Sequence, residues 1–144
     1  MIWKNSADPE HLNAMAKNTM LEHLGIRFTE SGDDYIEATM PVDERTVQPF
    51  GLLHGGASVT LAESLGSVAA NLCIDDTSRY ASVGVEINAN HLRPVSSGQN
   101  VTGRTTPVRV GRRIQVWNID IRDQRERLIC TSRVTVAVVD RPGQ

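Results

Sequence analysis

Gly55, Gly56 and Glu63 are the residues whose types and spacing could together act on a carbonyl group. The glycines open a segment with apolar residues at helical spacing, and the first turn of a helix offers N–H groups without intrahelical partners at the positive end of the helix dipole. A glycine lets an oxygen approach such a group with no Cβ in the way. Glu63 is the only charged residue between Ala57 and Ala70. A carboxylate in a segment with so few other polar residues needs an explanation, and a role in chemistry is one.

The spacing of Gly55 and Glu63 keeps them apart along the helix. Eight residues at 1.5 Å per residue give roughly 12 Å, so one chain cannot hold both groups within about 3 Å of the same reacting group. If both act on one substrate, two copies must pair so that Gly55 of one faces Glu63 of the other, which a two-fold dimer provides twice. The alternative is that Glu63 points to solvent and the glycines merely end a loop.

The length, net charge and composition of the chain exclude several classes of function. A chain of 144 residues suits one domain, residues 1–144, and is long enough to bury a core. Its net charge of -2 gives no electrostatic case for nucleic acid or an anionic membrane. The sequence has neither a long apolar span nor a signal-peptide pattern, so we expect a cytoplasmic protein. Cys73 and Cys130 lie in apolar segments, where free cysteine usually behaves as a small hydrophobe.

Hydrophobic periodicity predicts the elements that position these residues. A helical segment is expected at about 8–24 and a central helix at about 55–73. From Ala81 to Ala89 apolar and polar residues alternate, which predicts a strand covered on one face that runs out near Arg93. Further strands are predicted at 26–29, 35–42, 99–110, 112–123 and 127–139. The fold class is therefore α+β, with an antiparallel sheet of five to six strands curled around one long helix.

Motifs along nearly the whole chain resemble those of one known family. They occur at 1–4, 23–26, 40–43, 48–58, 61–67 and 88–94. With these motifs the sequence resembles the hotdog-fold acyl-CoA thioesterases that depend on a glutamate, and the spacing from His54-Gly55-Gly56 to Glu63 is specific to that group. The opening Met1–Lys4 and the run Gln48–Leu53 narrow the likeness to two branches, the 1,4-dihydroxy-2-naphthoyl-CoA hydrolases and the proofreading thioesterases of enterobactin synthesis.

The resemblance implies a role for each residue of the site. Glu63 would be the nucleophile or the general base, and the Gly55 N–H and the Gln48 amide would hold the thioester oxygen. His54 would support that loop or the oxygen site, and Ser67 would orient the water or the carboxylate. Without the resemblance, His54 is interpreted as a loop histidine bonded to backbone, and Ser67 as a small residue suited to helix packing.

The resemblance also implies where coenzyme A binds. Gly84 would pass near the pantetheine arm, and guanidinium groups suit the phosphates. The residues expected to line the coenzyme A entrance are His91, Leu92, Arg93, Pro94, Arg109, Val110, Gly111, Arg112 and Arg113. The alternative for the arginines is a solvated basic turn. We expect no metal, because His11 and His23 lack ligand spacing, and no cofactor apart from the coenzyme A that is part of the substrate.

The function expected from the resemblance is hydrolysis of aromatic acyl-CoA thioesters, with 1,4-dihydroxy-2-naphthoyl-CoA in menaquinone biosynthesis as the best-fitting substrate. One alternative is proofreading of a misacylated aryl carrier protein, with an acyl carrier protein as partner. Another is a non-catalytic acyl-CoA-binding module. The resemblance further implies a homodimer whose two copies pair again into a homotetramer.

Overall fold

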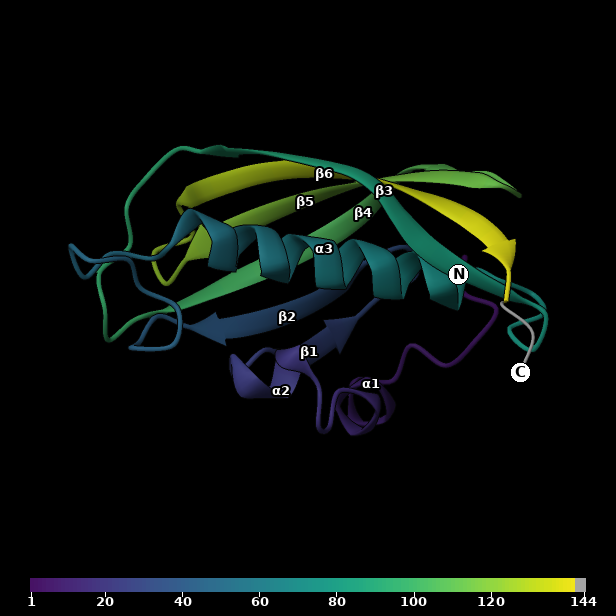
Figure 1. Ribbon diagram of the computed structural model, residues 1–144, viewed down its shortest axis with the longest axis horizontal. Helices are drawn as coiled ribbons and strands as arrows, with labels where there is room; N and C mark the ends of the chain where they lie inside the picture. The colour runs from purple at the N-terminus through teal and green to yellow at the C-terminus, as the bar shows by residue number, and fades with distance from the viewer. Residues whose placement is uncertain (142–144) are drawn as a thin grey trace.

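A six-stranded antiparallel sheet curls around one long helix in the computed structural model, which describes residues 1–141 (Figure 1). The elements in chain order are α1 (Pro9–Met15), α2 (Met20–His23), β1 (Arg27–Ser31), β2 (Ile36–Pro41), α3 (Gly55–Leu72), β3 (Tyr80–His91), β4 (Asn100–Val110), β5 (Ile114–Asp123) and β6 (Leu128–Asp140). The sheet order is β1-β2-β4-β5-β6-β3. The predicted class and the helix-wrapped sheet are confirmed.

The central helix α3 forms because its sequence has no proline and places apolar residues on one side. Leu61, Leu65 and Ala69 are fully buried against the sheet, whereas Glu63 and Ser67 lie on a half-buried side. The helix ends at Leu72, one residue before the predicted end, and Cys73 is its C-cap. The buried side fixes the rotation of α3, and therefore fixes where Glu63 points.

The predicted helix at 8–24 is wrong as a single element, because it divides into α1 and α2. Asn18 has φ 59, a left-handed conformation that interrupts a helix and that asparagine tolerates better than most residues. The Thr19 side chain then accepts a hydrogen bond from the Leu21 N–H at 3.3 Å and starts α2. A residue that caps a new helix thus competes with continuation of the old one.

The N-terminal residues pack against the C-terminal end of α3. The Lys4 N–H donates to the Leu72 carbonyl at 2.8 Å, and the Asn5 side chain donates to the Ile74 carbonyl at 2.8 Å. The first bond occupies a carbonyl that the last turn of a helix leaves unpaired, and the second holds the chain just after the C-cap Cys73. Trp3 stacks on Trp117 with ring centroids 6.0 Å apart. The opening motif Met1–Lys4 therefore has a structural role at the end of α3 opposite Gly55.

The edge strand β3 departs from its predicted pattern. Within the described residues it pairs only with β6, and the register shifts between Gly84 and Glu86, so Val85 is bulged out. Ile87 and Ala89 pack against the core as predicted, but Val83 and Val85 are 44% and 61% exposed, so the prediction of one continuous covered face is wrong for the part of β3 up to the bulge. Among residues 1–141 one edge of β3 pairs with no strand, while Ser82 and Gly84 face α3. A long edge strand with exposed apolar side chains favours pairing with another strand.

No helix within residues 1–141 is long and apolar enough to cross a membrane.

Candidate active site

The first turn of α3 leaves one N–H group available. His54 is the N-cap, and its Nδ1 accepts a hydrogen bond from the Gly56 N–H at 2.8 Å. The N–H groups of Ala57 and Ser58 donate to the His54 carbonyl at 3.0 and 3.2 Å. Among residues 1–141, the Gly55 N–H has no hydrogen-bond partner. The helix therefore presents the Gly55 N–H to a ligand, and His54 holds the adjoining turn in place with an unprotonated Nδ1.

Gln48 belongs to a tight turn that fixes its side chain. The Phe50 N–H donates to Gln48 Oε1, and the Gly51 N–H donates to the Gln48 carbonyl at 2.9 Å. Gly51 has φ 77, which glycine adopts without strain. Because the amide oxygen is occupied, the Gln48 NH₂ group is the part left to donate elsewhere. This is the orientation that a second donor to an anionic oxygen requires.

A cavity of about 350 Å³ joins these two donors. Six of the residues expected from the sequence line it: Gln48, Gly55, His91, Leu92, Arg93 and Pro94. Sequence reasoning missed four others: Leu52, Leu53, Ser58 and Ile129. Ser58 lies three residues after Gly55 on the same helix, and that spacing could have identified it. Ile129 comes from β6, and no local pattern relates it to Gly55.

The carboxylate of Glu63 lies in a polar contact beneath the edge strand. Ser67 Oγ donates to Glu63 Oε1 at 3.3 Å, and Ser82 Oγ from β3 donates to the Ser67 carbonyl at 3.2 Å. Gly84 lies directly against Glu63 Oε1, so a Cβ at this position would overlap the carboxylate. Glu63 is therefore half-buried and held, rather than pointing freely into solvent. Ser67 therefore bonds to the carboxylate of Glu63, one of the two groups that it was expected to orient.

Gly55 and Glu63 contact different ends of the same strand. The imidazole of His91 lies beside Gly55, with Nε2 2.9 Å from where a Cβ at Gly55 would be, while Gly84 lies against Glu63. Gly84 and His91 are seven residues apart on β3, or roughly 20 Å at 3.3 Å per residue with an allowance for the bulge. The Gly55 N–H and the Glu63 carboxylate of one copy thus do not meet, in agreement with their spacing along α3.

The basic turn Arg109–Arg113 also lies far from the cavity. Ile114, which follows this turn, pairs with Ala137 on β6, and Ala137 pairs with Val83 near the start of β3. The cavity lies at the other end of β3, where His91 ends the strand. The turn and the cavity are at opposite ends of the sheet (Figure 1). A single copy does not bring together the two segments expected to bind coenzyme A.

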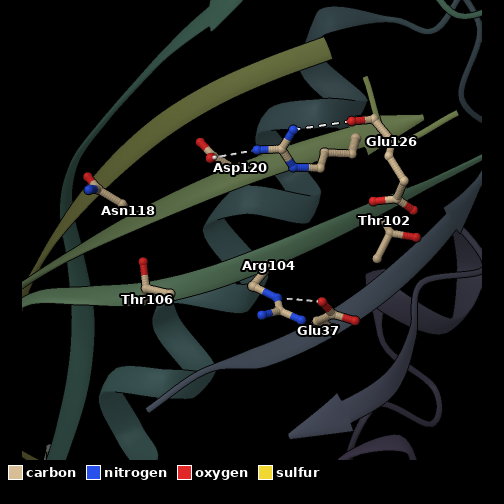
Figure 2. A pocket seen from close by; sticks show the side chains of 8 residues that line it. Glu37, Thr102, Arg104, Thr106, Asn118, Asp120 and Glu126 are labelled. Atoms are coloured by element: carbon tan, nitrogen blue, oxygen red, sulfur yellow. Dashed lines mark hydrogen bonds and ion pairs between the residues drawn. The ribbon is translucent and has the colours of Figure 1, made fainter. Parts of the chain in front are cut away.

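A larger hollow of about 520 Å³ lies on the side of the sheet turned away from α3. Figure 2 shows that its charged groups interact with one another: Arg104 is 2.5 Å from Glu37, and Arg122 is 3.5 Å from Asp120 and donates to the Glu126 carbonyl at 3.2 Å. Both arginines of the hollow are therefore engaged with acidic side chains on the same face of the sheet. The hollow is a solvated, ion-paired surface and a weaker candidate than the cavity at Gly55.

The cysteines offer no competing nucleophile. Burial raises the pKa of the Cys73 and Cys130 thiols to about 11, so both are protonated at neutral pH. Both are free cysteines. Within residues 1–141, no three His, Cys, Asp or Glu side chains come together as metal ligands. The carboxylate of Glu63 is the better candidate for attack on a carbonyl.

Comparisons with known proteins agree with this geometry. The family model described as the thioesterase superfamily matches residues 50–130. The chain is 55% identical over 139 residues to a 1,4-dihydroxy-2-naphthoyl-CoA hydrolase from Escherichia coli, covering 96% of this chain and all of the relative. It is 54% identical over 139 residues to a proofreading thioesterase, EntH, from Cronobacter turicensis, covering 96% and 99%.

A solved structure supports the same assignment. The crystal structure of a thioesterase from Haemophilus influenzae matches with a TM-score of 0.92 and 54% sequence identity, covering 97% of this chain and 96% of that one. These similarities confirm the hotdog fold. They support an enzyme rather than the alternative, a non-catalytic acyl-CoA-binding module. The chain therefore belongs to the thioesterase superfamily and is a thioester hydrolase.

Proposed function

We propose that this protein hydrolyses aromatic acyl-CoA thioesters and that its substrate is 1,4-dihydroxy-2-naphthoyl-CoA of menaquinone biosynthesis. The observation that carries the proposal is the unpaired Gly55 N–H, which opens into the same cavity as the Gln48 side chain. Two such donors suit a thioester oxygen that gains negative charge during attack. The choice of acyl group follows the activity named for the Escherichia coli relative, which is 55% identical.

In the proposed mechanism Glu63 attacks the thioester carbonyl carbon or removes a proton from water that attacks it. Direct attack forms a mixed anhydride and expels the coenzyme A thiolate, after which water cleaves the anhydride and restores the carboxylate. In the general-base route, water adds to the carbonyl carbon as its proton passes to Glu63. In both routes the Gly55 N–H and the Gln48 NH₂ group stabilise the oxyanion. The hydrogen bond from Ser67 orients the carboxylate.

Both routes need a second copy of the chain. The free edge of β3 offers an antiparallel partner strand to another β3, and such pairing would satisfy the backbone groups that β6 leaves unpaired. If Gly84 lies opposite the partner's His91, the two-fold axis passes between Ile87 and Asn88. Glu63 of one copy then lies beside the Gly55 cavity of the other. Two such dimers would pair into the proposed tetramer.

The same pairing would complete the coenzyme A site. The start of the partner's β3 would lie beside the end of this β3, and the partner's basic turn, 109–113, would come to the side of the cavity. Arg93 lines that cavity and is exposed. Guanidinium groups from both copies would then be available to the phosphates of one coenzyme A.

Arg93→Ala is expected to raise KM for an aryl-CoA about tenfold and to leave kcat within about twofold, because a phosphate contact remote from the carbonyl stabilises ground state and transition state alike. Initial rates of coenzyme A release over a range of substrate concentrations measure this. Arg27→Ala removes an exposed arginine from β1 and serves as the control. A fall in kcat with unchanged KM would place Arg93 at the reacting carbonyl instead.

A second candidate function is proofreading of misacylated aryl carrier protein, favoured by the 54% identity to EntH. The two functions are separated by kcat/KM for 1,4-dihydroxy-2-naphthoyl-CoA, alkyl-CoA esters and an acylated aryl carrier protein. We expect the naphthoyl-CoA value to exceed the others by about tenfold or more. A larger value for the carrier protein, lowered when Arg109, Arg112 and Arg113 are replaced by alanine, would establish proofreading instead.

A further inference from the structure

Ser58 places a hydroxyl group in the wall of the cavity without a hydrogen-bond partner among residues 1–141. The residue is 1% exposed and lines the cavity together with Gln48 and Gly55. Neighbouring hydroxyls on α3 behave differently: Thr60 donates to the Gly56 carbonyl at 2.9 Å, and Ser64 donates to the Thr60 carbonyl at 2.7 Å. Ser58 makes no such bond to the carbonyl four residues before it. Its hydroxyl therefore remains available to whatever fills the cavity.

Among residues 1–141 no fully buried side-chain nitrogen or oxygen lacks a hydrogen-bond partner, so the Ser58 hydroxyl, which makes no bond to the protein, is reached by the solvent in the cavity. Helical side chains lean toward the N-terminus, so Ser58 leans toward the turn that carries the Gly55 N–H. The nearby polar groups of Gln48 and Gly55 are N–H donors. A cavity lined by several donors suits a ligand that brings acceptor oxygens.

We propose that the Ser58 hydroxyl donates a hydrogen bond to a carbonyl oxygen of the bound acyl-CoA. Two oxygens of that chemistry pass through the cavity in the proposed function, the thioester oxygen and the first amide oxygen of the pantetheine arm. The inference rests on the proposed function. It adds a substrate contact by Ser58, a residue whose role no pattern in the sequence indicated. Ser58 thereby becomes a third donor in the wall that holds the substrate.

Ser58→Ala tests this contact through opposite effects on activity and stability. We expect kcat/KM for an aryl-CoA to fall about tenfold or more. The fall lies in kcat if the bond is made to the thioester oxygen, and in KM if it is made to the pantetheine amide. The thermal midpoint of the free enzyme stays the same or rises, because alanine breaks no hydrogen bond within residues 1–141 and favours the helix.

Ser132→Ala is the matched control. Ser132 is also buried, at 5% exposed, but its hydroxyl donates to the Asn88 carbonyl at 2.8 Å. Its removal is expected to lower the thermal midpoint by about 2 °C or more and to leave kcat and KM within about twofold. Ser58→Ala with unchanged kinetics would overturn the assignment. So would a loss of thermal stability or of dimers, which would show that the hydroxyl serves the fold or the partner.

The same assay separates failure of this inference from failure of the proposed function. Glu63→Gln is measured beside both serine variants. If Glu63→Gln turns over aryl-CoA at the wild-type rate, the proposed mechanism itself fails. If Glu63→Gln is inactive and Ser58→Ala is unchanged, only the assignment of Ser58 fails.

Discussion

Glu63→Gln is expected to lower kcat for aryl-CoA hydrolysis by about a thousandfold or more. Glutamine keeps the size of the side chain and an oxygen that can accept the Ser67 hydrogen bond, but it has no negative charge with which to attack a carbonyl or take a proton from water. Coenzyme A release, followed with a thiol reagent at saturating substrate, measures the change. KM is expected to change little, because the carboxylate contributes mainly in the transition state.

Two observations make the Glu63 result interpretable. Glu44→Gln alters an exposed acid in the loop before α3 and should keep wild-type kinetics. The thermal midpoint of Glu63→Gln should stay near that of the wild type, since the carboxylate is only half-buried. A turnover number within about threefold of wild type would exclude Glu63 from the chemistry.

Mixing subunits that carry Gln48→Ala with subunits that carry Glu63→Gln is expected to restore about a quarter of the wild-type activity. Each parent should be nearly inactive, since loss of one oxyanion donor alone costs about a hundredfold or more. In a mixed dimer, the intact Gln48 of one subunit faces the intact Glu63 of the other. Random mixing makes about half of the dimers mixed, and each has one intact site of two.

The subunits would be unfolded together, refolded and assayed against each parent treated in the same way. Recovery that requires co-refolding supports a site shared between copies. If activity stays at the sum of the parents although mixed dimers form, Gln48 and Glu63 act within one chain. The separation of their surroundings along β3 would then require a large movement of α3 before reaction.

Local patterns in the sequence predicted the main elements well. The central helix was expected at about 55–73 and is Gly55–Leu72, because its apolar stripe and the absence of proline are properties of consecutive residues. The strand pairs joined by short turns follow the same reasoning. The Gly55–Glu63 separation also needed no tertiary information, because helical rise alone fixes it.

What the sequence did not predict depends mainly on contacts between distant parts of the chain. Val83 and Val85 alternate as in a covered strand, yet they are exposed because Ser82 and Gly84 face α3 and the register shifts between Gly84 and Glu86. Strand register also separates Arg93 from the turn at 109–113 within one copy, so their expected place at one coenzyme A entrance stays a prediction that needs a second copy. The break at Asn18 is an exception, since a local capping residue, Thr19, produced it.

By itself the sequence determined the class of fold, the helix that opens at Gly55 and the distance from that helix start to Glu63, because hydrophobic period and helical rise are set by neighbouring residues. Tertiary structure decided which groups share a cavity. Only the packing of α3 on β3 and β6 brought His91 and Ile129 to Gly55, buried the Ser58 hydroxyl beside them and left one strand edge open. Such contacts join residues far apart in the chain, so a pattern of neighbouring residues does not predict them.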